Sequence, residues 1–386
     1  MSDCGPTQSV VEAVGSAISA GVSVTRQQAI ALFENASDEE LSRLASRARA
    51  KYHQPADATY LIMAIVNYTN ICVAKCGYCS FYKLPHQSGG YLLKFEEVCS
   101  HIDELLEFGG TLVAFNGGFN PNLRIQDYAD LFAGIRKRYQ DRGLEFFEMT
   151  IAEFMFTCKL SKVSYAEGAN ILAAHGTRWI TGGGAEILDD GFRRRHSPGK
   201  YTVQDYFNAQ RAVLSAGIGT TATMVIGFDE TLDERMNHLE SLREFQDSTG
   251  NALTSFLCWT YKPHHNELGD KLNGSEISTR EYLRWLAICR IYLHNFEHIR
   301  SSVLTKNEDA LIGLKYGAND FDLPTEDEVT QKAGASISRE FSRILATADR
   351  LGFQVRHRSP FMSKVHKHSF DACKRNVGSL TPATAP

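Results

Sequence analysis

The sequence lacks the features that mark membrane-inserted, secreted or nucleic-acid-binding proteins. It contains no run of 18 apolar residues, and its first residues have neither the charged start nor the long apolar stretch of a signal peptide. Basic residues do not outnumber acidic ones, with 41 Lys and Arg against 45 Asp and Glu, so the basic stripe that nucleic acid requires is missing. We therefore expect a cytoplasmic protein with no membrane and no nucleic-acid partner.

Internal repeats and low-complexity linkers are also missing, and 386 residues suit a single α/β barrel with extensions. From Tyr60 onwards, short apolar runs of strand length alternate with helical segments, which predicts a parallel sheet closed into a (β/α)8-type TIM barrel. Thr25 and Ser37 are expected N-caps of helices that precede it. The expected organisation is an N-terminal helical extension (1–55), the barrel (56–325), a C-terminal extension packing on the barrel (326–372) and a disordered tail (373–386).

Cysteine is scarce outside one loop. Three of the nine cysteines, Cys72, Cys76 and Cys79, follow the first predicted strand with the spacing C-x3-C-x2-C. In a reducing compartment such a group indicates a metal or catalytic site rather than disulfides, and loops after barrel strands form the active face. Three thiolates favour an iron–sulfur cubane with one open iron. The alternatives are a zinc ion, which takes four ligands and would need a distant residue such as His86 or Cys99, and buried thiols without metal.

The loop "CVAKCGYC" resembles that of radical S-adenosylmethionine (SAM) enzymes. The resemblance implies that Cys72, Cys76 and Cys79 hold a [4Fe–4S] cluster, that the open iron binds SAM, and that Tyr78 lies near the adenine. One-electron reduction by a flavodoxin- or ferredoxin-type partner then yields a 5′-deoxyadenosyl radical.

Further segments narrow the resemblance. "NGGFNPNL", "TGGGAEILDDGFRRRHSP", "TTATMVIGFDE" and "KYGANDF" are similar to the branch that contains cyclic dehypoxanthine futalosine synthase, aminofutalosine synthase and FO synthase. This branch implies radical carbon–carbon bond formation, a cyclisation of a nucleoside-like small molecule as in menaquinone biosynthesis.

Several residues are candidates for holding the cofactor. Gly117 and Gly118 follow the second predicted strand and lack the Cβ that would keep the backbone from a ligand, although a plain turn is the alternative. Glu186, placed by its triple glycine on a predicted fourth strand over 178–188, could accept the ribose hydroxyls of SAM. Arg193 could clamp a carboxylate, or both could form an ion pair at a helix start. Asn70 could bind SAM or brace the cysteine loop.

The residues expected to contact the substrate match the branch less well than those expected to hold the cofactor. We expect the substrate to be lined by five residues: Asn116, Asn120, Phe147, Trp259 and Tyr261. Candidate proton acceptors are Glu148, Asp229 and His264. The branch usually has Gln at 116, His at 147 and Ser-Pro-Pro at 150–152, and a change of polar partners changes which substrate a site accepts. A related radical SAM cyclase or rearrangement enzyme, acting on another nucleoside or aromatic metabolite in a specialised natural-product pathway, is therefore the alternative. A non-enzymatic metal-binding protein is the alternative from another class.

Overall fold

The computed structural model describes residues 6–358. Their main feature is one eight-stranded sheet in which every pair of strands is parallel. The strands are β1 (Asp57–Val66), β2 (Leu112–Phe115), β3 (Glu145–Phe147), β4 (Thr220–Ile226), β5 (Leu253–Thr260), β6 (His298–Ser301), β7 (Asp320–Asp327) and β8 (Gln354–His357). Apolar runs form these strands because their residues are buried on both faces, as in β1, where only Asp57 and Thr59 are not fully buried.

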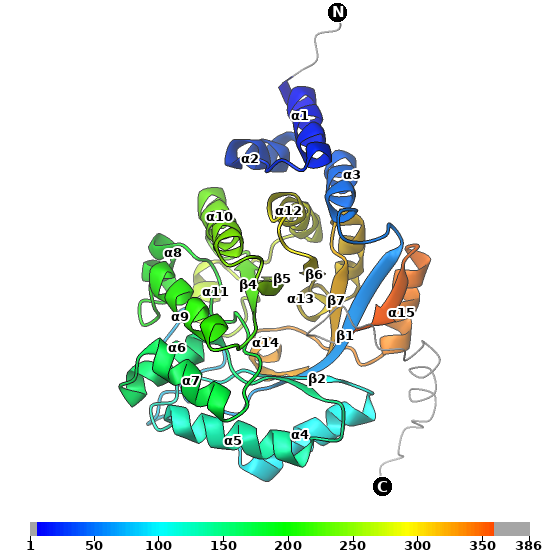
Figure 1. Cartoon of the computed structure of the whole chain (residues 1–386). Helices are drawn as coiled ribbons and strands as arrows, with labels where there is room; N and C mark the ends of the chain where they lie inside the picture. The colour runs from blue at the N-terminus through cyan, green and yellow to red at the C-terminus, as the bar shows by residue number, and fades with distance from the viewer. Residues whose placement is uncertain (1–5, 359–386) are drawn as a thin grey trace, which may run out of the picture.

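The strands follow the order β3-β2-β1-β7-β6-β5-β4, which confirms a β/α barrel, although a partial one (Figure 1). β1 is its longest strand and has three neighbours. It pairs with β7 along most of its length, with β2 at its carboxyl end and with β8 at its start.

The predicted fourth strand over 178–188 is wrong as a regular strand. The β-pairing of this segment is limited, within residues 6–358, to two isolated bridges, Trp179 to Gly219 and Thr150 to Thr181, so it lies between β3 and β4 as an irregular piece of the wall. The glycines explain the irregularity. A Cβ on Gly182 would lie 2.2 Å from the Thr221 carbonyl oxygen, and Gly184 has a φ of +87°.

Helices cover the outside of the sheet (Figure 1). In chain order they are α1 (Pro6–Ala20), α2 (Arg26–Asn35), α3 (Asp38–Arg49), α4 (Phe95–Glu107), α5 (Ile125–Arg138), α6 (Ile151–Ser161), α7 (Tyr165–Ala174), α8 (Asp190–His196), α9 (Val203–Ser215), α10 (Leu232–Ser248), α11 (Glu267–Lys271), α12 (Thr279–Tyr292), α13 (Val303–Lys306), the 3-10 helix η1 (Asn307–Tyr316), α14 (Glu328–Lys332) and α15 (Phe341–Arg350). No helix within residues 6–358 is both long and apolar enough to cross a bilayer.

The N-terminal helices α1–α3 pack at one end of the barrel, against α12 and η1 (Figure 1). Thr25 and Ser37 cap α2 and α3, each in a complete capping box, as predicted. At the other end of the chain, the expected boundary at 325/326 falls inside β7, and the strand β8 pairs with β1. The predicted tail (373–386) lies outside the described residues, as does the final part (359–372) of the expected C-terminal extension.

Candidate active site

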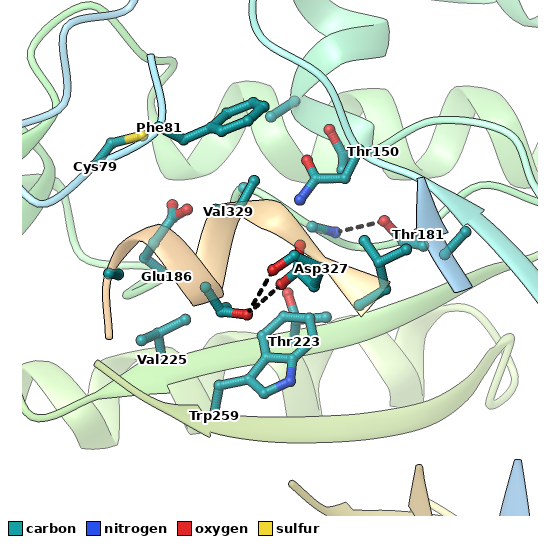
Figure 2. Close-up of a pocket in the computed structure, with 18 of the residues that line it drawn as sticks. Cys79, Phe81, Thr150, Thr181, Glu186, Thr223, Val225, Trp259, Asp327 and Val329 are labelled. Carbon is teal, nitrogen blue, oxygen red and sulfur yellow. Dashed lines mark hydrogen bonds between the residues drawn. The ribbon is translucent and has the colours of Figure 1, made fainter. Parts of the chain in front are cut away.

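A cavity of about 290 Å³ lies inside the barrel, and the loops after seven strands contribute to its wall. The cysteine loop follows β1, Asn116–Phe119 follow β2, and Thr150 follows β3. Residues that follow β4, β5, β6 and β7 complete the wall, and Figure 2 shows a selection of these side chains. The cavity therefore opens at the carboxyl ends of the strands, where parallel barrels place their active sites.

Main-chain hydrogen bonds hold the cysteine loop in place. Cys72 N–H donates to the Lys83 carbonyl (2.9 Å), and Gly77 N–H donates to the His196 carbonyl (2.9 Å). Asn70 braces the same loop, because its amide nitrogen donates to Gly89 O (2.9 Å) and its oxygen accepts from Tyr91 N–H (2.8 Å). Of the two roles considered for Asn70, the structure has it in the second, since its side chain does not line the cavity.

The three thiols meet in the cavity. Cys72, Cys76 and Cys79 are free, line the same wall and pack in one small apolar cluster with Phe119 and Ala152. Burial raises the pKa of the Cys76 thiol to about 12 and also raises that of Cys79, so a bound metal must displace the thiol protons.

The two distant residues considered as completing a zinc site lie elsewhere. His86 is exposed, and Cys99 is buried in α4 beneath Tyr139, whose hydroxyl donates to the Cys99 carbonyl (3.0 Å). Neither lines the cavity. Within residues 6–358, no three His, Cys, Asp or Glu side chains are grouped tightly enough to share one metal ion. Three cysteines without a fourth ligand suit a cubane, which is held by cysteine thiolates, better than a structural zinc ion, which takes four ligands.

Gly117 and Gly118 line the cavity beside the cysteine loop, and their packing requires glycine. A Cβ on Gly118 would lie 2.3 Å from Ile71 O and 2.8 Å from Cys72 Cβ. A Cβ on Gly117 would lie 2.7 Å from the ring of Tyr68. Close packing against the Tyr68 ring explains Gly117, and close packing against the cysteine loop explains Gly118 and ties the β2 turn to the metal-ligand candidate Cys72.

Glu186 lies in the cavity wall in a left-handed conformation, with φ of 42°. Lys200 Nζ lies 2.9 Å from both of its carboxylate oxygens, and the two side chains are only 9% and 15% exposed for Lys200 and Glu186. Burial alone would lower the pKa of the Lys200 ammonium, but the neighbouring carboxylate outweighs it and the pKa is raised. The site thus holds a buried charge pair beside the cysteines.

Aromatic rings border this pair. Tyr78 lines the cavity, and its ring centroid lies 5.2 Å from that of Phe228 and 5.6 Å from Lys200 Nζ. Tyr261 also packs against Phe228, with the two rings tilted by 35° and their centroids 4.6 Å apart. A flat ligand placed here would contact rings as well as charge.

Two sequence patterns match known families. The radical SAM superfamily pattern covers residues 66–242, and the CofH/MqnC C-terminal region covers residues 250–366. The cyclic dehypoxanthine futalosine synthase of Halalkalibacterium halodurans is 34% identical over 327 residues, which span 84% of this chain and 87% of that protein. The chain belongs to the radical SAM superfamily. The expected resemblance is confirmed, and membership implies a [4Fe–4S] cluster and SAM.

Further relatives and solved structures resemble this radical SAM enzyme. The aminodeoxyfutalosine synthase of Thermus thermophilus is 30% identical over 86% of this chain and 90% of that protein. Among solved structures, the [FeFe]-hydrogenase maturase HydG superimposes with a TM-score of 0.70 at 16% identity, covering 95% of this chain and 80% of that one. Methylornithine synthase (PylB) gives 0.64 at 17% identity, covering 89% and 97%. At such identities the structural likeness concerns the fold alone.

Four of the five predicted substrate residues of the radical SAM enzyme line the cavity: Asn116, Phe147, Trp259 and Tyr261. Phe147 packs edge-on to Trp179, with ring centroids 6.4 Å apart. The indole Nε1–H of Trp259 is buried and has no hydrogen-bond partner within residues 6–358. The fifth, Asn120, does not line it. Its side chain donates to Thr69 Oγ1 (3.1 Å) and accepts from Asn122 N–H (3.0 Å), which stabilises the turn after β2.

The three predicted proton acceptors all lie outside the cavity wall of this radical SAM enzyme. Glu148 alternates with Phe147, so its side chain points outward, where it pairs with Arg136. Asp229 accepts a hydrogen bond from His196 Nε2 (2.6 Å), and His264 is exposed at the surface. None of the three is placed to take a proton from a molecule in the cavity.

Arg193 also points away. Its Nε donates to Tyr201 O (2.7 Å) and its Nη1 to Ala185 O (2.9 Å), so it braces the main chain on both sides of the Glu186–Lys200 pair. The prediction that it clamps a carboxylate has no support in this arrangement.

Sequence reasoning missed three charged residues that line the cavity of the radical SAM enzyme, Lys200, Arg300 and Asp327. Lys200 lies in an irregular stretch between α8 and α9, and no sequence signal distinguishes it from other surface lysines. Asp327 ends β7, and a carboxylate at the carboxyl end of a barrel strand is a usable signal once that strand is recognised.

Proposed function

We propose that this radical SAM enzyme forms a carbon–carbon bond within a nucleoside-like substrate of the dehypoxanthine futalosine type, by radical cyclisation. One observation carries the proposal: the three free thiols, the Glu186–Lys200 pair and a largely apolar wall share one cavity. Two relatives named cyclic dehypoxanthine futalosine synthase, 34% and 32% identical, support this substrate class.

Cys72, Cys76 and Cys79 would hold the [4Fe–4S] cluster, and the donor set suits it because cubanes are bound through cysteine thiolates. SAM bound at the cluster supplies, on one-electron reduction, a 5′-deoxyadenosyl radical that takes a hydrogen atom from a sugar carbon. The electron comes from an external flavodoxin- or ferredoxin-type protein.

The remaining residues on the cofactor side of the cavity would position SAM. Each oxygen of Glu186 that accepts from Lys200 retains a further lone pair, so the carboxylate can also accept two ribose hydroxyls. Tyr78 would contact the adenine, and Gly117 and Gly118 would let main-chain groups approach the amino acid part of SAM. These residues would together hold the cofactor.

The substrate side of the cavity is formed mainly by apolar side chains. Met63, Ile65, Ala114, Phe147 and Leu304 line it and belong to one buried cluster. Such a wall excludes water and holds an arene near the sugar, which favours intramolecular attack over quenching of the radical by other hydrogen donors.

Anaerobic reconstitution with iron and sulfide, followed by dithionite, SAM and dehypoxanthine futalosine, tests the proposal. We expect 5′-deoxyadenosine and a cyclised product in equal amounts. Cys76→Ala should lose the cluster absorbance and all turnover. Cys99→Ala, which removes a buried thiol outside the cavity, should keep both. Turnover in Cys76→Ala would refute the assignment of the loop.

A second candidate function rests on Phe147. The branch usually has a histidine at this position, and an apolar ring cannot hydrogen-bond a polar substrate. Radical cyclisation or rearrangement of another aromatic or nucleoside-like metabolite is the function that this residue favours. Formation of 5′-deoxyadenosine from SAM with no change in dehypoxanthine futalosine would select it over the first.

A further inference from the structure

Asp327 is a second carboxylate in the cavity wall, besides Glu186. It is the last residue of β7, only 3% exposed, and its side chain lies in the cavity wall together with those of Thr223 and Trp259 (Figure 2). No Lys, Arg or His in residues 6–358 forms an ion pair with it. Burying a carboxylate without a cationic partner costs free energy, so its position in the cavity needs an explanation.

One of its two oxygens is held and the other is unused. Thr330 Oγ1 donates to Oδ2 (2.6 Å), one of the interactions drawn as dashed lines at Asp327 in Figure 2. Oδ1 accepts no hydrogen bond within residues 6–358. Asn67 Nδ2 donates to Asn116 O (2.9 Å), and the Asn67 side chain also favours the charged form of Asp327. Thr330 therefore orients the carboxylate and leaves one acceptor oxygen for a ligand.

Helix capping explains only part of the environment of Asp327. The residue occupies the N-cap position of α14, where its side chain makes no regular capping hydrogen bond, although the main-chain N–H groups of Val329 and Thr330 favour its charged form. Its neighbours behave differently. Glu326 pairs with His101 (2.7 Å), and Glu328 accepts from the Tyr91 hydroxyl (2.6 Å), both at a separate pocket outside the cavity. Alternation along the strand sends only Asp327 inward.

We propose that Asp327 is the proton acceptor of the cyclisation, which makes this inference dependent on the proposed function. When the sugar-carbon radical adds to the arene, a carbon–carbon bond forms and the attacked ring carbon becomes tetrahedral, with one hydrogen still attached. That carbon–hydrogen bond then breaks, its electron pair returns to the ring, and the proton passes to Asp327 Oδ1. The remaining unpaired electron leaves to a one-electron acceptor of the iron–sulfur class, and the ring is aromatic again.

The environment suits this role. Burial raises the pKa of Asp327 to about 6, against the hydrogen bond from Thr330, which favours the carboxylate. A base is most effective when its pKa approaches the working pH, provided that it stays ionised. The apolar wall around it also offers no competing acceptor at Phe147, Leu304 or Met63.

The test compares Asp327→Asn with the matched variant Glu328→Gln, which removes the neighbouring carboxylate that faces away. Each full-length protein is reconstituted with its cluster, and 5′-deoxyadenosine, cyclised product and the dissociation constant of dehypoxanthine futalosine are measured. Proton transfer by a positioned side chain contributes about 10²–10⁴-fold. We therefore expect Asp327→Asn to lower cyclised product at least about 100-fold while 5′-deoxyadenosine continues to form and the dissociation constant changes less than threefold.

A second readout separates proton transfer from packing. With deuterium on the ring carbon that is attacked, the variant should show a larger isotope effect on product formation than wild type, and Asp327→Glu should restore part of the product. Cyclisation by Asp327→Asn within threefold of wild type would overturn the inference alone. Equal losses of deoxyadenosine and product, with weakened binding, would overturn it in favour of a binding role. No cyclised product from wild type would instead refute the proposed function, and this inference with it.

Discussion

Lys200 Nζ lies 2.9 Å from both carboxylate oxygens of Glu186, and this buried pair stands in the same cavity wall as the three cysteines. The carboxylate in turn raises the pKa of the Lys200 ammonium, although burial alone would lower it. A carboxylate held in this way is ready to accept hydroxyl groups.

Removal of the cation should weaken SAM binding. In Lys200→Met, Glu186 is left buried without its partner, and we expect the dissociation constant of SAM to rise about 10- to 100-fold, since hydrogen bonds to charged groups contribute about 1.5–3 kcal/mol. Equilibrium dialysis with anaerobically reconstituted protein measures it. Lys271→Met, which removes an exposed partner of Glu267, is the control and should bind SAM as wild type does. Equal affinity in both variants would contradict the assigned role.

Gly118→Ala should displace the cysteine loop. Its Cβ would lie 2.3 Å from Ile71 O, and since main chain cannot rotate away, Cys72 must move. We expect less than half of the wild-type iron per chain and a loss of about 1–3 kcal/mol in the free energy of unfolding. Iron analysis and urea unfolding measure these effects. Gly77→Ala is the matched control within the loop, because its nearest neighbour would be His196 O at an ordinary 3.8 Å. Full iron content in Gly118→Ala would show that the turn does not position the loop.

Acid should destabilise the protein through His238. Leu188 N–H donates to its Nδ1 (2.9 Å), and burial lowers its pKa to about 3. The folded protein therefore keeps this histidine neutral, while the unfolded chain binds a proton as the pH falls below about 6.5, so stability is lost in that range. Between pH 8 and pH 5, wild type should lose about 2 kcal/mol more than His238→Asn, as measured by urea unfolding. Parallel losses in the two proteins would contradict this.

Glu148→Gln should affect stability and leave catalysis unchanged. Glu148 is buried, pairs with Arg136 and does not line the cavity. Because Arg136 is partly exposed, we expect a loss of only about 1–3 kcal/mol in the free energy of unfolding. Turnover per folded molecule should stay within twofold of wild type. A larger fall in turnover, at a temperature where the variant is folded, would restore Glu148 as a candidate base.

Much of the fold was predictable because local signals agreed with the tertiary structure. β1, β4 and β5 are apolar runs buried on both faces, and the caps at Thr25 and Ser37 form as the sequence indicates. The segment 178–188 was mispredicted because its apolar residues indicated a strand, whereas its glycines were decisive: at Gly182 a side chain would meet Thr221 O.

Within the site, it was easier to predict which residue types are present than which way each side chain points. Phe147 and Glu148 are adjacent in an extended chain, so only one can face the cavity, and sequence alone did not say which. Arg193 is one of three consecutive arginines, and its orientation depends on the carbonyls of Ala185 and Tyr201, which only tertiary structure brings together. Asp327 was missed since β7 had not been recognised as a strand.

The pairing of β1 with β7 and β8 has a consequence for how the protein is made. β1 leads directly into the cysteine loop, yet two of its neighbours are the last strands to leave the ribosome. During synthesis the strand that leads into the three thiols therefore lacks two of its three partners until β7 and β8 have emerged.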